Sequence, residues 1–367
     1  MHLPSTAQPH VFEFLRRAHA SGRKAHAYLF HGPEGAGKEA MALQWAQTLL
    51  CERQGEWACE TCRSCRRIKH FDHPDVYFIF PRVASATEEE QREVLVSMSE
   101  NPFLRSRPWE NPQILIGDIR AIKQKLSMTS YEGRGVVIII AETEKMRDEP
   151  ANALLKILEE PPPHTYFVLA TATMESVVPT IVSRCHPLRF STISANEIKN
   201  ILITQAGVDS SRAEFIAALA NGNLRRACSL LDSATDDLRK QAVELLRTAF
   251  RAARPADQTD FVEAIVKERD RRELRQILEF CLVWIRDGMI LHAHRSHPAG
   301  VEPAGAIVNT DMRGALEALV TNLPEIDYGG VIAELEFAIE CLDRYVQPWL
   351  VLMVMLQKVR AHARFRR

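Results

Sequence analysis

The clearest chemistry in the chain lies in the stretch HGPEGAGKEA, residues 31–40, which has the spacing of a phosphate-binding loop. Gly32, Gly37 and Lys38 match the pattern G-x-x-x-x-G-K-[ST], and Gly35 is a further glycine inside the loop. The backbone N–H groups of such a loop form an anion site at the start of a helix, and Lys38 would reach the outer phosphates. A glycine-rich turn between a strand and a helix needs no nucleotide, so that alternative stays open.

Two positions that should hold Mg²⁺ carry the wrong residue types. Glu39 stands where the loop pattern has a Ser or Thr hydroxyl, and Ala141 follows the apolar run VVIII where an Asp is expected. Glu142 comes one residue later, and neighbouring side chains of a strand point to opposite faces, so we do not expect Glu142 to replace the Asp. Together these changes argue against ATP hydrolysis by this chain alone. The alternative is an ATPase in which Glu39 and Glu142 hold Mg²⁺ in an unusual way.

A second kind of chemistry is indicated by four clustered cysteines with the spacing C-x7-C-x2-C-x2-C: Cys51, Cys59, Cys62 and Cys65. Four thiolates this close together suit a closed tetrahedral site, for which Zn²⁺ is the usual occupant, and such a site is structural. A redox-active Cys-x-x-Cys pair and an iron–sulfur cluster are the alternatives. The nearby His70 and His73 are interpreted as loop residues, and the other four cysteines as buried thiols.

The composition excludes a strong overall attraction to nucleic acid. The 367 residues carry a formal net charge of −1, so any contact with DNA must come from partners or from local basic segments such as CRSCRRIKH and KVRAHARFRR. No apolar run reaches the roughly 18 residues that a membrane span needs. The first 30 residues also lack the pattern of a signal peptide, so we expect a cytoplasmic protein.

The elements that position these residues change character along the chain. The stretches AHAYLFHG, DVYFIF, RGVVIIIA and TYFVLAT are predicted as strands, with EAMALQWAQTLLC and EPANALLKILEE as helices. Alternation of this kind indicates a parallel sheet covered by helices. Residues 82–113 form a polar insertion with one helix of its own. From Ser194, which has capping-box spacing to Glu197, the sequence predicts helices and no strand.

Several of these stretches occur in an order that resembles the bacterial clamp-loader subunits of DNA polymerase III. They are HAYLFHGPEGAGKE, the four cysteines, HPDVYFI, NALLKILEEPP, FVLAT and TIVSRC, and the resemblance covers about residues 20–232. It implies a RecA-like AAA+ domain at 1–190 with a zinc module at about 51–66. A three-helix lid at 191–233 and a helical collar at 234–367, which joins subunits into a hetero-pentamer, would follow.

The resemblance also implies a task and residue roles. The family loads a sliding clamp onto primer-template DNA, and its gamma/tau motor subunits act together with a delta subunit. Ser183, Arg184 and Cys185 match a Ser-Arg-Cys motif whose arginine enters the ATP site of a neighbouring subunit. By the same resemblance, Thr171 matches a sensor residue and Arg225 a nucleotide-contacting arginine of the lid.

The departures at Glu39 and Ala141 favour a non-motor member of the family that supplies Arg184 in trans and binds ATP or ADP weakly or not at all. Two alternatives remain: a self-sufficient motor ATPase, and a zinc-dependent nucleic-acid-binding module on an inert phosphate-loop scaffold. The second predicts steeply salt-dependent binding of nucleic acid by the isolated chain.

Overall fold

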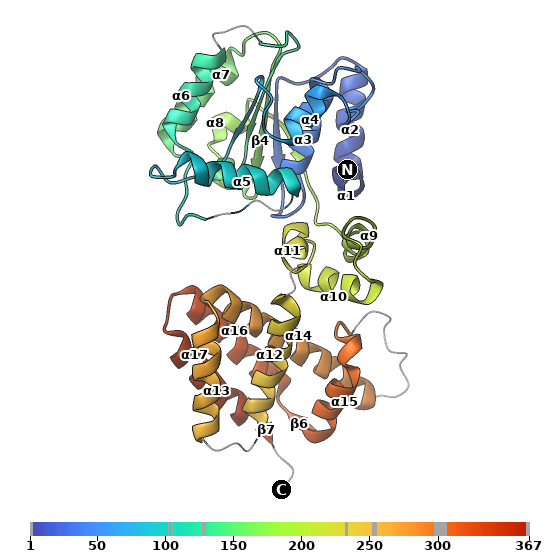
Figure 1. The fold of residues 1–367 in the computed structure, drawn as a ribbon, viewed down its shortest axis with the longest axis vertical. Coiled ribbons are helices and arrows are strands. Elements are labelled where there is room, and N and C mark those ends of the chain that lie inside the picture. The colour runs from blue at the N-terminus through green and yellow to red at the C-terminus, as the bar shows by residue number, and fades with distance from the viewer. Residues whose placement is uncertain are drawn as a thin grey trace. The chain divides into compact units, whose positions relative to one another are not determined.

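The structure is a computed structural model that describes residues 3–101, 103, 106, 108–126, 130–231, 234–251, 255–296 and 307–364. It divides into two compact units (Figure 1). Unit 1 consists of residues 1–208 and 220–229, and unit 2 of residues 209–219 and 230–367. Within the described ranges, no helix has the length and apolar character to cross a membrane.

Unit 1 is built on a parallel five-stranded sheet with the order β2-β3-β4-β1-β5. The strands are β1 (Ala27–His31), β2 (Val76–Ile79), β3 (Val136–Ile140), β4 (Thr165–Thr171) and β5 (His186–Arg189). The first four confirm the predicted strands. The fifth was not predicted, because it is short, contains Pro187 and buries only Leu188. Proline is tolerated there since β5 is an edge strand.

Both faces of this sheet are covered by helices. The described helices of unit 1 are α1 (Leu3–Ala7), α2 (Pro9–Ala20), α3 (Lys38–Leu49), α4 (Arg63–Lys69), α5 (Glu88–Glu100), α6 (Ile116–Leu126), α7 (Asp148–Glu159), α8 (Pro179–Val182), α9 (Ala195–Ala206) and α11 (Leu224–Ser229). Side chains alternate along each strand, so that Leu29 packs with α6, α7 and α8 while Tyr28 and Phe30 pack with α2 and α3. The parallel sheet is therefore buried on both sides, which explains its almost wholly apolar strands.

The insertion at 82–113 is closed at its base by the backbone of Arg82 and Gln113, which exchange hydrogen bonds of 2.9 and 3.0 Å. Its predicted helix is confirmed as α5, which begins at a capping box formed by Thr87 and Glu90. Residues 102, 104, 105 and 107 lie outside the described residues. The insertion packs onto the sheet edge through Trp109, whose ring stacks on Phe80.

Unit 2 is mainly helical. Its described helices are α10 (Ser210–Ala220, of which the last residue groups with unit 1), α12 (Ala234–Phe250), α13 (Pro255–Glu268), α14 (Arg271–Ser296), α15 (Arg313–Asn322), α16 (Tyr328–Asp343) and α17 (Pro348–Ala361). The expectation of no strand after Ser194 was wrong, because β6 (Glu325–Ile326) pairs with β7 (Ala363–Arg364). Two-residue strands carry no periodicity that a sequence pattern could reveal. Short 3₁₀ turns lie at Thr143–Lys145 and Met174–Ser176 in unit 1, and at Thr310–Met312 in unit 2.

The predicted order of an α/β part followed by helices is confirmed. The capping box of Ser194 and Glu197 is also confirmed at the start of α9. The division at 191–233 and 234–367 stays a prediction; position 233 lies outside the described residues. The compact units group α9 and α11 with the sheet, and nearly all of α10 with the later helices.

Candidate nucleotide pocket, metal centre and exposed arginine

Two glycines of the loop between β1 and α3 closely approach other segments of the chain. A Cβ atom on Gly32 would lie 2.2 Å from the carbonyl oxygen of Phe190. One on Gly35, whose φ is +73°, would lie 1.8 Å from Asn223 Oδ1. The N–H of Leu224 donates to the Gly35 carbonyl at 3.1 Å. Glycine at position 35 therefore lets the loop contact the turn that begins α11, and this contact brings Arg225 to the loop.

Lys38 folds back onto the loop that carries it. Its Nζ donates to the carbonyl oxygens of Gly32 and Pro33, both at 2.7 Å. Burial of the ammonium group lowers the pKa of Lys38 to about 8. The Lys38 ammonium group, which the motif assigns to phosphate, is thus hydrogen-bonded to two carbonyl oxygens of its own loop.

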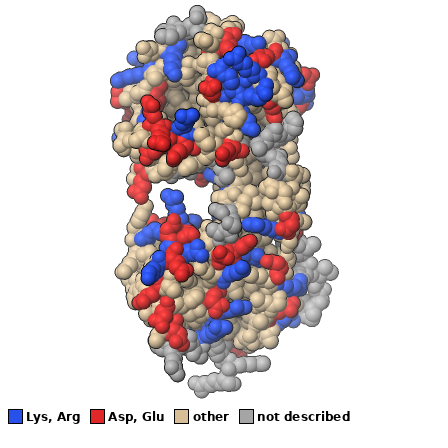
Figure 2. All heavy atoms as spheres, viewed as in Figure 1, with Lys and Arg blue, Asp and Glu red and all other residues tan. Residues whose placement is uncertain are grey.

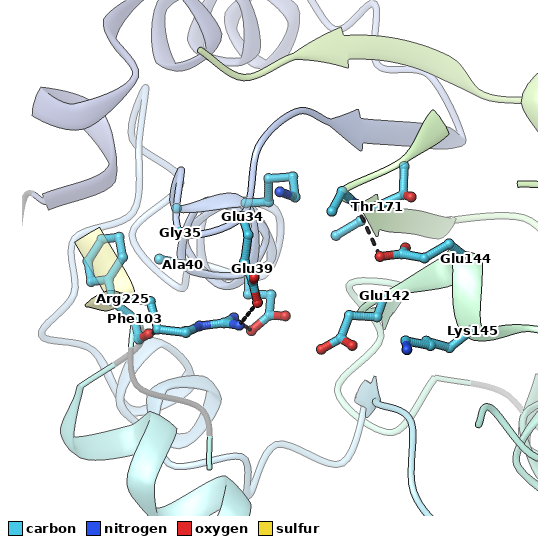
Figure 3. Close-up of a pocket in the computed structure, with 14 residues that line it drawn as sticks. Glu34, Gly35, Glu39, Ala40, Phe103, Glu142, Glu144, Lys145, Thr171 and Arg225 are labelled. Atoms are coloured by element: carbon cyan, nitrogen blue, oxygen red, sulfur yellow. Dashed lines mark hydrogen bonds and ion pairs between the residues drawn. The ribbon is translucent and has the colours of Figure 1, made fainter. Parts of the chain in front are cut away.

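The loop opens into a pocket of about 240 Å³ in unit 1 (Figure 3). Its lining carries four carboxylates and three cationic side chains: Glu34, Glu39, Glu142 and Glu144, with Lys38, Lys145 and Arg225. Gly35, Gly37, Ala40, Phe103, Ala170, Thr171 and Ala172 complete it. A pocket that binds a nucleoside triphosphate needs an excess of positive charge, from side chains or from bound Mg²⁺. The side chains here give a formal charge of −1.

Arg225 is engaged by the acids of the loop. Its Nη1 lies 2.7 Å from Glu34 Oε1 and its Nη2 lies 3.6 Å from Glu39 Oε2, contacts that Figure 3 shows as dashed lines. Its Nε also donates to the carbonyl oxygen of Phe103 at 3.4 Å. Arg225, the arginine that the resemblance assigns to the lid, thus lines the pocket.

The argument that excluded Glu142 was wrong. The strand β3 ends at Ile140, and Glu142 takes a left-handed conformation with φ of +51°, so the alternation of side chains in a strand does not apply to it. Its carboxylate lines the pocket, as Figure 3 shows. Glu142 therefore lies in the pocket wall although it comes one residue after the position at which the motif places the Asp.

Thr171 lies in the pocket wall and is fully buried. Its hydroxyl donates to the Thr173 carbonyl and accepts from the Thr173 N–H, both at 3.1 Å. The neighbouring N–H of Ala172 donates to Glu144 Oε1 at 3.3 Å (Figure 3). The hydroxyl is thus used in a local turn at the end of β4.

Among the charged and aromatic residues that line this pocket, sequence reasoning missed four: Glu34, Phe103, Glu144 and Lys145. Glu34 could have been recognised, because it lies inside the glycine-rich loop itself. Phe103 comes from the insertion, and no local pattern connects it to the loop.

The four cysteines form the second candidate site. The Sγ atoms of Cys51, Cys59, Cys62 and Cys65 all lie within 4.8 Å of one another. In a tetrahedral zinc site with Zn–S bonds of about 2.3 Å, the sulfurs are about 3.8 Å apart, so the cluster fits such an ion. Elsewhere in the described residues no comparable group of ligands is found.

The environment of the thiols favours a bound cation. Burial opposes ionisation of Cys59, but hydrogen bonds from the backbone of Thr61 and Cys62 lower its pKa to about 6. Burial and the neighbouring thiols raise the pKa of Cys65 well above its usual range. A divalent cation would offset the repulsion among the thiolates. His73 bonds to Ser64 Oγ at 3.1 Å and His70 to Ser99 Oγ at 2.8 Å, in agreement with their interpretation as loop residues.

Arg184 lies just after α8 on the surface of unit 1, with 34% of its side chain exposed. Its Nη1 donates to the Thr180 carbonyl at 3.1 Å, and its Nη2 forms an ion pair with Glu159 at the end of α7. The guanidinium is therefore neither buried nor part of the pocket of its own chain.

Known proteins resemble this chain. The family described as "DNA polymerase III, delta subunit" matches residues 7–194. The chain is 30% identical over 240 residues to the DNA polymerase III subunit delta' of Bacillus subtilis, which covers 65% of this chain and 63% of that protein. It is 31% identical over 233 residues to the subunit tau of the same organism, covering 62% and 36%. The chain thus spans less than two thirds of the length of both relatives.

Proposed function

Because this chain belongs to the DNA polymerase III delta subunit family, we propose that it is a delta prime-like, non-motor subunit of a clamp loader. In this role it helps to place a ring-shaped clamp on primed DNA, as one of the subunits of a hetero-pentamer with gamma/tau and delta subunits. The proposal of a non-motor role is supported by the charge of the pocket. Arg225 and Lys38, two of its cations, are already bound to groups of the chain itself.

A triphosphate would have to break these contacts before it gained any of its own. Arg225 would leave Glu34, and Lys38 would leave two carbonyl oxygens. The freed carboxylates would then face the phosphates, and each such pair of like charges at about 4 Å costs on the order of 4 kcal/mol at an effective dielectric constant of 20. The contacts within the pocket therefore oppose both the binding and the hydrolysis of a triphosphate.

One observation supports the rival function, a self-sufficient ATPase. Glu39, Glu142 and Glu144 line the same pocket, and one or two carboxylates together with phosphate oxygens are the usual ligands of Mg²⁺. A metal ion would reverse the local charge and draw the phosphates in. This function requires that the isolated chain hydrolyse ATP.

The contribution to hydrolysis comes instead from Arg184, acting in the site of a neighbouring motor subunit. Its guanidinium is exposed, and its intramolecular ion pair with Glu159 is of the weak, solvent-screened kind. An arginine supplied in trans is worth roughly 10³ to 10⁵ in the rate of phosphoryl transfer. A subunit with an inactive pocket can thus be necessary for its neighbour.

The cysteine cluster is proposed as a structural Zn²⁺ site held by Cys51, Cys59, Cys62 and Cys65. A closed set of four thiolates leaves no position for water, so the ion supplies folding free energy and no catalysis. Cys51 follows the end of α3 and Cys65 lies in α4, so the ion would fasten α4 onto the helix that begins at the loop lysine.

The test is reconstitution with motor and delta subunits in which only the motor site beside this chain remains competent. We expect the isolated chain to be inactive and the assembly to show DNA-dependent hydrolysis that falls roughly 10³-fold with Arg184→Ala. Arg120→Ala is the control, because Arg120 also forms an intramolecular ion pair at the surface of the same unit, with Glu149. ATP hydrolysis by the isolated chain that is lost with Lys38→Ala would establish the rival function instead.

A further inference from the structure

The helix α4 of the cysteine module has two faces of opposite character. Ser64, Cys65 and Ile68 are buried, whereas Arg63, Arg66 and Lys69 are exposed. At about 100° per residue, the three cations lie within one arc of the helix surface. Figure 2 shows a cluster of Lys and Arg side chains on unit 1 in the region where Figure 1 labels α4.

These three cations have no carboxylate partner among the residues that the structure describes. The acids of the same module are used elsewhere: Glu52 accepts from the N–H of Ser64, Glu56 pairs with Arg16, and Glu60 accepts from Gln44. The acids of the module are therefore engaged by other groups, whereas the three cations of α4 face solvent.

The helix dipole explains only part of this arrangement. Arg66 and Lys69 lie in the last turn of α4, where cations interact favourably with the negative end of the dipole. Arg63 is the first residue of the helix, at the positive end, where the dipole disfavours a cation. A local stabilising role thus does not account for the whole face.

An exposed aromatic side chain belongs to a loop that is tied to the same helix. Tyr131 is 82% exposed, although its backbone N–H donates to Asp75 at 2.7 Å. The next residue, Glu132, pairs with Arg67 of α4 at 3.2 Å and with the buried His73 at 3.3 Å. The loop is therefore fixed to the module while the phenol ring stays free, which is the preorganisation that a stacking platform needs.

We propose that Arg63, Arg66, Lys69 and Tyr131, here called the α4 surface, bind single-stranded nucleic acid. Exposed cations contact the phosphate backbone, and an exposed aromatic ring stacks on an unpaired base. An acidic protein would satisfy the cations equally well but gives no reason for the exposed ring. This surface is separate from the nucleotide pocket, so the inference does not depend on the non-motor role.

The test is binding of a fluorescent oligo(dT) to the full chain, followed by anisotropy over a series of salt concentrations. We expect the triple variant Arg63→Gln, Arg66→Gln, Lys69→Gln to reduce the slope of log K against log salt by about 2, at roughly 0.7 per phosphate contact. Tyr131→Ala should weaken binding at least fivefold, and Tyr131→Phe should retain it because the ring remains.

The matched control removes three exposed cations from unit 2 with Lys267→Gln, Arg272→Gln and Arg286→Gln. The metal content of every variant shows whether the cysteine module has stayed folded, and the Tyr131 pair tests the surface without touching α4. The proposal is overturned if the control triple lowers the slope as much, if Tyr131→Ala binds like Tyr131→Phe, or if polyglutamate competes as well as oligo(dT).

Discussion

Arg225 Nη1 lies 2.7 Å from Glu34 Oε1, so the arginine of α11 neutralises an acid of the phosphate-binding loop. The two residues are 191 positions apart in the chain. In a nucleotide site the same arginine would face phosphate. With this pair and the folded-back Lys38, two cations of the pocket are already bound to groups of the chain itself. The first two predictions below follow from these contacts.

Removing the two acids nearest Arg225 should restore affinity for nucleotide. In the double variant Glu34→Ala, Glu39→Thr, Arg225 is released and a hydroxyl stands at the position that ligates Mg²⁺. We expect Mg²⁺-ATP to bind at least tenfold more tightly, a gain of about 1.4 kcal/mol, as measured with a fluorescent ATP analogue. The matched control is Glu263→Ala, Glu268→Thr on exposed positions of unit 2. Equal affinity of wild type and double variant would mean that the acids do not limit binding.

The lowered pKa of Lys38 should make its contribution to stability depend on pH. Burial holds the folded-state pKa at about 8, below the unfolded value of about 10.4, so the charged form is disfavoured in the folded protein. Between these values the unfolded state binds more protons, and the free energy of unfolding therefore rises with pH. Chemical denaturation at pH 7.5 and 9.5 should show wild type gaining relative to Lys38→Met. A difference that does not change with pH would contradict the buried ammonium.

Metal should be bound in a ratio of about one ion per chain and should stabilise unit 1. Trp57 reports on the module, because its ring packs against Phe12 at 4.7 Å and Trp45 at 6.0 Å. We expect Cys62→Ser to lose the ion, shift the tryptophan fluorescence and lower the thermal midpoint by several degrees. Cys341→Ser, in unit 2, is the control and should retain the metal. Full metal content in Cys62→Ser would rule out the four-cysteine site.

Loosening the ion pair of Arg184 should assist its action in trans. In Glu159→Gln the guanidinium no longer has to leave a carboxylate, and an exposed pair is worth about 0.2 to 1 kcal/mol. The rate at the neighbouring site should therefore rise by up to about fivefold, with the stability of the isolated chain almost unchanged. Glu149→Gln, which frees Arg120 in the same way, should leave the rate as it is. A rate that falls in Glu159→Gln would instead show that the carboxylate positions the arginine.

The sequence by itself determined the features that depend on local spacing. A glycine-rich loop after an apolar strand, four thiols within 15 residues and runs of β-branched residues each specify their structure through neighbours in the chain. For this reason the strands β1 to β4, the loop and the cysteine cluster could be predicted. The sequence alone also shows that position 39 lacks the Ser or Thr, and position 141 the Asp, that the motif uses to hold Mg²⁺.

Only the tertiary structure decided the electrostatic state of the site. The pairing of Arg225 with Glu34, the entry of Phe103 into the pocket wall and the ion pair of Arg184 with Glu159 join distant segments, and periodicity carries no information about such contacts. Glu142 shows the same limit at short range, because a single left-handed residue after β3 changed where its carboxylate points. The residue types along a chain determine which charges are available. The Coulomb energy of a pair depends on the distance between its two charges, and folding sets that distance.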